Sequence, residues 1–276
     1  GPEYETIYSF GGLCMIKEME EVAYLNDLCD RLGIDTITTG NLCGLVMEAH
    51  QQGRLDYEIE YGNADQTIAL VEKIGTRTDI GDILADGIIS ATAKWSLEDL
   101  AIHVKGLEPA GYDPRVLKGM GLTFGTAPRG ACHLRTTFYK PELAGLIPPD
   151  QIEKTAEMLI DYENRLNIFD TLTLCRFYRD LYSWDELEHT LEMITGITRS
   201  KDELQAIAAH IADMTRRFNI QEGFTAADDR LPKRFHKEVL PEGGSLSEAD
   251  MEHMLQDYYR LRGWNHQGIP QTREEV

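Results

Sequence analysis

The sequence contains little cysteine and no closely spaced cysteine pair. Its 276 residues include 5 cysteines, an odd number that is widely scattered. Small secreted domains held by disulfides carry many cysteines in even numbers, so we expect no disulfide framework here. A reducing cytoplasmic compartment is therefore the simpler expectation.

Long apolar runs and basic residues are also scarce. No stretch approaches the roughly 20 apolar residues that a membrane-spanning helix requires, so we expect no membrane insertion. The 27 Lys and Arg against 47 Asp and Glu give a net charge of −20. Such a charge argues against partners made of nucleic acid or anionic membrane. The chain is 42% hydrophobic, which is enough for a substantial core and a globular fold. It has no signal peptide and no initiating methionine, and we expect Gly1 to be an internal position of a longer protein.

Helical periodicity dominates what the sequence does contain. Apolar residues recur at helical spacing from Ile16 to Leu32, and Gly33 follows as a typical left-handed cap. Only residues 54–61 alternate like a strand, and we expect an extended connector there. Further helices are predicted from about 38 to 52, from 63 to 75, from 79, over 113–120, from 151 to 175, and from 247 to 263, with capping boxes at Ser96, Ser183 and Ser200. The sequence predicts an all-α fold.

A segment rich in glycine and proline divides the chain. It runs from Gly106 to Gly130 and interrupts the helical patterns on either side. We place the seam between two helical domains there, the first over 1–108 and the second over 109–276.

One six-residue pattern occurs twice, at Asp30–Asp35 and at Asp170–Cys175. Each copy has Asp at its first position and Ile or Leu at its fifth. The side chain at its sixth position can accept a hydrogen bond or bind a metal. Backbone turned out of a helix exposes N–H and C=O groups, and flanking carboxylates can hold a polar ring against them. Ordinary helix capping is the alternative explanation of such a pattern.

The segments around this pattern resemble a known family. The relevant segments are Gly1–Thr6, Asn26–Gly40, Val104–Pro109, Tyr112–Arg115, Thr126–His133 and Arg262–Trp264. In that order they closely resemble the tungsten-containing aldehyde ferredoxin oxidoreductases. The resemblance covers only the later part of such an enzyme. The family's N-terminal β-rich domain and its Cys-x2-Cys-x3-Cys run are absent from this sequence.

The resemblance implies a fold and an activity. The fold is two helical domains like domains 2 and 3 of the family. The activity is oxidation of aldehydes to carboxylic acids at a tungsten (or molybdenum) bis-pterin site. Electrons would pass through a [4Fe-4S] cluster to ferredoxin. Two alternatives stay open, a family member that acts on another substrate such as an aromatic thioester, and a non-catalytic helical scaffold or assembly subunit.

The resemblance also assigns roles to individual residues. The positions that align with the family's pterin contacts are Asp30, Ile34, Asp35, Asp170 and Leu174. Arg129 aligns with a cofactor-binding arginine. Arg135 stands where the family commonly has Lys, which binds with a different geometry. Thr173 stands where the family commonly has Gly.

Cys175, Glu5 and His133 are the implied reactive residues. Cys175 aligns with the fourth cysteine ligand of the [4Fe-4S] cluster, whereas its apolar surroundings alone favour a buried core thiol. Glu5 and His133 align with groups near the metal and are the implied acid–base pair. The family holds its metal through pterin dithiolenes, so no protein ligand cluster is expected.

The chain by itself lacks three of the four thiolates that such a cluster requires. We therefore expect the isolated chain to retain no cofactor and to be inactive. Apolar faces that belong against the missing N-terminal domain would favour self-association into homo-oligomers.

Overall fold

The chain folds into helices joined by loops. The computed structural model describes residues 1–148 and 151–271, and within these ranges it contains no β-strand, only two isolated β-bridges. The prediction of an all-α chain is confirmed. Residues 54–61 are a connector between two helices, as their pattern predicted. No helix in the described ranges has the length and apolar character needed to cross a membrane.

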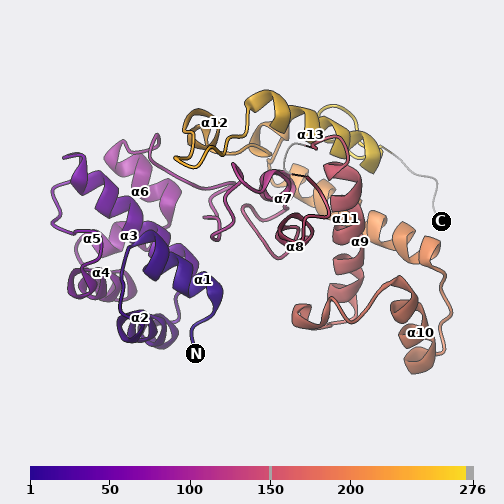
Figure 1. Cartoon of the computed structure of the whole chain (residues 1–276), viewed down its shortest axis with the longest axis horizontal. Coiled ribbons are helices and arrows are strands. Elements are labelled where there is room, and N and C mark those ends of the chain that lie inside the picture. The colour runs from indigo at the N-terminus through magenta and orange to yellow at the C-terminus, as the bar shows by residue number, and fades with distance from the viewer. Residues whose placement is uncertain (149–150, 272–276) are drawn as a thin grey trace. The chain divides into compact units, whose positions relative to one another are not determined.

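The described chain divides into two compact units, whose helices can be followed in Figure 1. The first unit comprises Gly1–Tyr112, Arg129–Ala131 and Leu231–Glu238. The second comprises Asp113–Pro128, Cys132–Arg230 and Val239–Val276.

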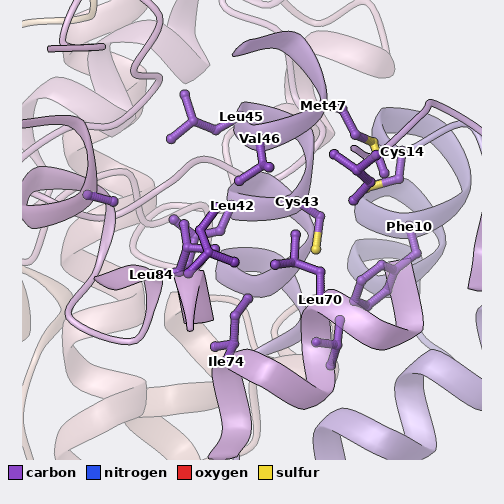
Figure 2. Close-up of a cluster of buried hydrophobic side chains, with 14 of the residues drawn as sticks. Phe10, Cys14, Leu42, Cys43, Leu45, Val46, Met47, Leu70, Ile74 and Leu84 are labelled. Carbon is purple, nitrogen blue, oxygen red and sulfur yellow. The ribbon is translucent and has the colours of Figure 1, made fainter. Parts of the chain in front are cut away.

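The first unit is built mainly from the N-terminal helices. They are α1 (Tyr4–Thr6), the π-helix η1 (Ile7–Leu13), α2 (Met19–Leu32), α3 (Thr36–Gln51), α4 (Ala64–Thr76), α5 (Ile80–Leu84), α6 (Ile88–Trp95) and, from later in the chain, α12 (Lys233–Lys237). Helix α3 is the central element, because most of its residues from Thr39 to Ala49 are buried. Figure 2 shows side chains of η1, α3 and α4 gathered around Cys43.

The second unit contains the longer helices. They are α7 (Lys118–Thr126), α8 (Tyr139–Leu143), α9 (Thr155–Thr171), the short 3-10 helix η2 (Arg176–Tyr178), α10 (Trp184–Thr195), α11 (Lys201–Gln221), the 3-10 helix η3 (Ala226–Asp228) and α13 (Glu248–Arg262). Helix α9 packs against both α11 and α13.

Charged residues are buried where α9 meets α13. Arg262 is 2% exposed, and its guanidinium donates to Glu163 at 2.5 Å and to Asn164 at 2.6 Å. A second buried ion pair joins Arg216 to Asp229 at 2.8 Å. Burying a charge is costly unless it is paired, so these pairs fix how the helices pack.

Several local signals were interpreted correctly. The capping boxes at Ser183 and Ser200 are both present, and each serine accepts a hydrogen bond from the backbone N–H three residues later. Gly33 ends α2 at a φ of 69°, and Gly263 ends α13 at a φ of 72°. These signals depend on backbone chemistry within a few residues, which explains why the sequence was sufficient to predict these helix ends.

Other local predictions were wrong. Ser96 begins no helix, because it takes the left-handed conformation and ends α6 instead. Gly75 does not end α4, which continues to Thr76. A Cβ at Gly75 would lie 2.6 Å from Leu32 Cδ1, so packing against α2 explains this glycine. The helix predicted over 113–120 starts only at Lys118.

The crossing of α4 and α5 gives a test of the first unit. A Cβ at Gly81 would lie 2.1 Å from the Lys73 carbonyl oxygen, a contact that only backbone movement can relieve. We expect Gly81→Ala to lower the free energy of unfolding by about 1–3 kcal/mol or more, measured by chemical denaturation.

Gly12→Ala is the matched control for this substitution. Its added Cβ would meet nothing closer than Tyr8 Cδ2 at 3.7 Å, an ordinary contact. Equal stability of the two variants would contradict the packing explanation.

Candidate functional site

Glu5 lies half-buried in α1, at the start of the first unit. Its Oε1 accepts a hydrogen bond from the Tyr112 hydroxyl at 3.3 Å. The ring of Tyr112 stacks on Tyr4 with centroids 5.3 Å apart, and Tyr4 in turn donates to the Gly111 carbonyl at 2.9 Å. The carboxylate of Glu5 is therefore oriented by a segment more than 100 positions away in the sequence.

A glycine allows this segment to approach α1. A Cβ at Gly111 would lie 2.5 Å from the ring of Tyr8, so any larger residue would push the segment away. Asn41 of α3 donates to the Pro109 carbonyl at 3.4 Å. The segment 108–112 is thus attached to both α1 and α3.

A buried threonine connects Glu5's helix to the first copy of the repeated pattern. The Thr6 hydroxyl donates to Asn26 Oδ1 at 3.1 Å, and Asn26 donates to Asp30 Oδ2 at 3.0 Å. Thr6 also bonds to the Thr36 hydroxyl at 2.9 Å. Because the single proton of Thr6 is used on Asn26, Thr36 is the donor in that second bond.

The first copy of the pattern is the turn that connects α2 to α3. The Gly33 N–H donates to the Asp30 carbonyl, and the Ile34 N–H donates to the Cys29 carbonyl. Asp35 then caps α3 by accepting from the Thr38 N–H at 2.8 Å. Both aspartates are exposed, so their carboxylates can reach a ligand beside the turn.

The second copy has the same backbone pattern at the end of α9. The Thr173 N–H donates to the Asp170 carbonyl at 3.1 Å, and the Leu174 N–H donates to the Phe169 carbonyl at 2.9 Å. Thr173 has a φ of 56°, so it takes the left-handed conformation that Gly33 takes in the first copy. The turn therefore forms despite the threonine, at some cost in backbone strain.

Asp170 is held by two arginines. Its Oδ2 lies 3.0 Å from Arg135 Nη1 and 2.6 Å from Arg176 Nη2. Arg176 also donates to the Leu134 carbonyl. The segment that carries His133 and Arg135 is thereby tied to the second turn.

Cys175 has an exposed thiol, whereas Cys14, Cys29, Cys43 and Cys132 are buried. The interpretation of Cys175 as a buried core thiol is wrong, because α9 ends before it and the chain turns outward. No group of three or more potential metal-binding side chains occurs in the part of the chain that the structure describes. The role of Cys175 as a ligand of an iron–sulfur cluster stays a prediction.

The remaining predicted residues lie in different units. Arg129 is exposed in the first unit, and His133 is buried in the second, at 8% exposure. Within the first unit, the Thr6 network joins the helix that carries Glu5 to Asp30 and its turn. Within the second, Arg135 and Asp170 are in contact, and the turn continues to Leu174 and Cys175.

Behind Asp170 the second unit contains a cavity of about 130 Å³. Its lining includes Arg135, Asn167, Asp170, Arg216, Asn219 and Tyr258. The Asn167 side chain is 7% exposed, yet its amide makes no hydrogen bond to any residue within 1–148 and 151–271. Polar side chains thus line part of this cavity.

Glu108 is a second buried group with unused hydrogen-bonding capacity. It is 3% exposed, and its Oε2 accepts from the Thr38 hydroxyl at 3.0 Å, while Oε1 has no partner among the described residues. Burial raises the pKa of Glu108 to about 7, and the nearby Asp35 carboxylate adds to this effect. The neutral form of the carboxyl is therefore favoured up to a higher pH than in an exposed glutamate.

Sequence reasoning missed Tyr112, Glu108, Arg176 and Asn167. Tyr112, Glu108 and Arg176 make hydrogen bonds to residues that are 107, 70 and 42 positions away in the sequence. Tyr112 and Glu108 lie inside segments that carried the family resemblance, which was the one available signal.

The geometry can be compared with known proteins. The family described as "Aldehyde ferredoxin oxidoreductase, domains 2 & 3" matches residues 1–275. The tungsten-containing aldehyde ferredoxin oxidoreductases of Pyrococcus furiosus and Thermococcus kodakarensis are 32% and 33% identical to the chain over 289 residues. These alignments cover 100% of the chain and 48% of each relative, so the chain spans about half the length of these curated relatives.

Two further proteins are more distant. The aliphatic sulfonate oxidoreductase, WOR-like subunit, of Pyrococcus furiosus is 26% identical over 298 residues, covering 100% of the chain and 45% of that protein. Among solved structures, the active site complex BamBC of benzoyl coenzyme A reductase has a TM-score of 0.77 at 19% identity. The structural alignment covers 96% of this chain and 47% of the matched chain in that complex. This last likeness concerns the fold.

Glu108 gives a pH-dependent test of the site. Its pKa in the folded chain is raised above the ordinary value of 4.5, so its contribution to stability is fully present below pH 4.5 and is lost as pH rises through about 7. Glu108→Gln cannot ionise. We expect its free energy of unfolding, relative to the unmodified chain, to rise by up to about 3 kcal/mol between pH 5 and pH 8.

Denaturant titrations across this pH range measure the difference. Glu58→Gln is the control, because Glu58 is exposed and its replacement also removes a single carboxylate. If the difference in the free energy of unfolding between Glu108→Gln and the unmodified chain did not change with pH, the raised pKa of Glu108 would be contradicted.

Proposed function

Since the chain belongs to the aldehyde ferredoxin oxidoreductase family and spans its domains 2 and 3, we propose that it forms the catalytic helical part of an enzyme that oxidises aldehydes to carboxylic acids. The relatives named above are oxidoreductases. The observation that carries the proposal is the Thr6 network, which joins the helix of Glu5 to the first Asp-bounded turn. The helix that carries the Glu5 carboxylate is thereby joined to a turn whose exposed aspartates can bind a cofactor.

The residues of the two turns fit a pterin cofactor. Asp30 and Asp35 present exposed carboxylates that can accept hydrogen bonds from ring N–H and amino groups. Asp170 presents a carboxylate fixed by two arginines, and the Asn167 side chain lines the cavity behind it. When bound, a tungsten (or molybdenum) bis-pterin supplies the acceptor for two electrons. Arg129 and Arg135 are the cations that we assign to its anionic groups.

In this proposal Glu5 is the proton acceptor of the reaction and His133 is the hydrogen-bond donor to the substrate. Conversion of an aldehyde to an acid adds one oxygen atom from water and releases two electrons and two protons. Glu5 accepts a proton from the oxygen that attacks the carbonyl carbon, while Tyr112 keeps its carboxylate oriented. His133 donates a hydrogen bond to the carbonyl oxygen and polarises it.

Cys175 connects this chemistry to electron transfer. We assign its thiol as one of four thiolate ligands of a [4Fe-4S] cluster, from which electrons leave to ferredoxin. Its exposure supports the assignment, because the other four cysteines of the described chain are buried. The other three ligands have to come from outside this chain, so the isolated chain should be inactive.

Glu5 and His133 can be tested in the full-length enzyme. Glu5→Gln keeps the shape of the side chain and loses the proton acceptor, and His133→Asn removes the imidazole ring. We expect each to lower kcat by about 10²–10⁴ with KM little changed, since a positioned acid or base acts on the transition state. Steady-state kinetics with an aldehyde panel measures this effect, with metal and pterin content determined on the same samples.

Glu3→Gln is the matched control, because Glu3 is exposed and lies just before α1. Near-normal kcat in a fully loaded Glu5→Gln enzyme would remove Glu5 from the mechanism. Turnover of benzoyl thioesters or sulfonates in place of aldehydes would contradict the proposed substrate class.

Cys175 has a separate test. We expect Cys175→Ser to lose the iron–sulfur signal in electron paramagnetic resonance and most of the ferredoxin-linked activity. Cys43→Ala, which alters a buried core thiol, should retain the cluster. A full complement of iron and a normal spectrum in Cys175→Ser would contradict the assignment.

A further inference from the structure

We propose that Glu108 is a positioning residue for Glu5: it anchors the segment 108–112 to α3, so that the Tyr112 hydroxyl meets the Glu5 carboxylate. The inference rests on the proposed function for the role of Glu5, and it adds a buried carboxyl that lies outside the repeated pattern. Its basis is the burial of Glu108, the hydrogen bond from α3 and the short path from Glu108 to Tyr112.

Glu108 is buried beside a neutral partner. It is 3% exposed, and its Oε2 accepts from the Thr38 hydroxyl at 3.0 Å. Its Oε1 is buried and has no hydrogen-bond partner among the described residues. A glutamine or an apolar residue would fill the same space at a lower cost of desolvation, so packing alone does not explain a glutamate here.

Thr38 binds two carboxyl groups at the start of α3. Its backbone N–H donates to Asp35 Oδ2 at 2.8 Å, and its hydroxyl donates to Glu108. Because the Asp35 cap fixes the first turn of α3, the Thr38 hydroxyl has a defined position from which to hold Glu108. The turn that carries Asp35 and the segment 108–112 thus share one anchor.

The path from Glu108 to Tyr112 is short and restricted. Pro109 follows Glu108 directly, and its ring fixes its own φ. Ala110 is 3% exposed, and its carbonyl accepts from the Tyr112 N–H at 2.7 Å. With so few free torsions between them, a displacement of Glu108 should also displace the Tyr112 side chain.

Tyr112 transmits this position to Glu5. Its hydroxyl donates to Glu5 Oε1 at 3.3 Å, and its ring stacks on Tyr4. A hydrogen bond of this length is close to the limit of the interaction, so a small displacement would break it. A donor to a carboxylate favours the charged form, which is the form that can accept a proton.

The charge on Glu108 should affect how firmly the segment is held. Burial raises the pKa of Glu108 to about 7, and the Asp35 carboxylate adds to this effect. Asp35 lies in the turn before α3, and Glu5 lies on α1 at the far end of the segment. Both groups are acidic, so neither offsets a negative charge on Glu108. As pH rises through the pKa of Glu108, the segment 108–112 should loosen.

Hydrogen exchange on the 276-residue chain tests the anchor without any cofactor. We expect peptides that cover 108–112 to exchange roughly tenfold faster in Glu108→Ala than in the unmodified chain. Glu108→Gln should exchange like the unmodified chain at pH 6, because its amide oxygen can still accept from Thr38. Between pH 6 and pH 8, after correction for intrinsic rates, exchange should accelerate in the unmodified chain and not in Glu108→Gln.

Glu58→Gln is the control for hydrogen exchange, because Glu58 is exposed. Its exchange over 108–112 should follow the unmodified chain at every pH. The pH comparison with Glu108→Gln decides the matter even if Glu108→Ala does not fold.

A double-mutant cycle in the full-length enzyme tests whether Glu108 acts through Tyr112. Tyr112→Phe removes the donor to Glu5. We expect Tyr112→Phe and Glu108→Ala each to lower kcat roughly tenfold with KM little changed, and the double variant to be no slower than the slower single variant. Glu108→Gln should recover the kcat lost in Glu108→Ala.

Either of two results would overturn the inference: additive losses of kcat in the double variant, or exchange over 108–112 that depends on pH equally in Glu108→Gln and the unmodified chain. Failure of the proposed function would look different. A full-length enzyme that oxidises no aldehyde, from a chain whose exchange follows the expected pattern, would contradict the function and support the anchor.

Discussion

A left-handed residue follows the ends of both α2 and α9, and it determines the geometry of the turn after each helix. In each turn, the N–H of the fourth residue returns to the carbonyl of the aspartate, and the N–H of the fifth returns to the carbonyl before it. The helix stops, and the sixth residue points away from the helix axis. In the first turn this residue is Asp35, which caps α3, and in the second it is Cys175, whose thiol is exposed. The same backbone turn thus places a carboxylate at its sixth position in one copy and a thiol in the other.

The surroundings of the two turns contain polar groups that cost stability. Glu108 Oε1 and Arg216 Nη2 are buried and have no hydrogen-bond partner among the described residues. Thr173 adds a strained backbone. A core selected for stability alone would avoid all three, so their occurrence next to the turns agrees with a site whose partners arrive with the ligand. The buried Arg262–Glu163 and Arg216–Asp229 pairs keep the helices of the second unit in register.

Family membership was readable from the sequence, and the match over residues 1–275 confirms it. The all-α fold and the capping boxes at Ser183 and Ser200 were also predicted correctly, because helix periodicity and caps depend on neighbours a few residues apart. Ser96 and Gly75 were wrongly predicted as helix boundaries because the prediction considered only neighbours in the sequence. Each has the right local chemistry for a helix boundary, but tertiary packing assigns it another role.

The sequence by itself determined which residues can accept protons, bind metals or end helices, since those properties belong to the side chain and its immediate neighbours. Only the tertiary structure decided which of them meet. Tyr112 reaches Glu5 and Thr38 reaches Glu108 across 107 and 70 positions, through contacts that no local pattern encodes. The exposure of Cys175 was likewise decided by packing. Burial and hydrogen-bond partners are properties of the whole fold, because they depend on which distant segments exclude water from each side chain.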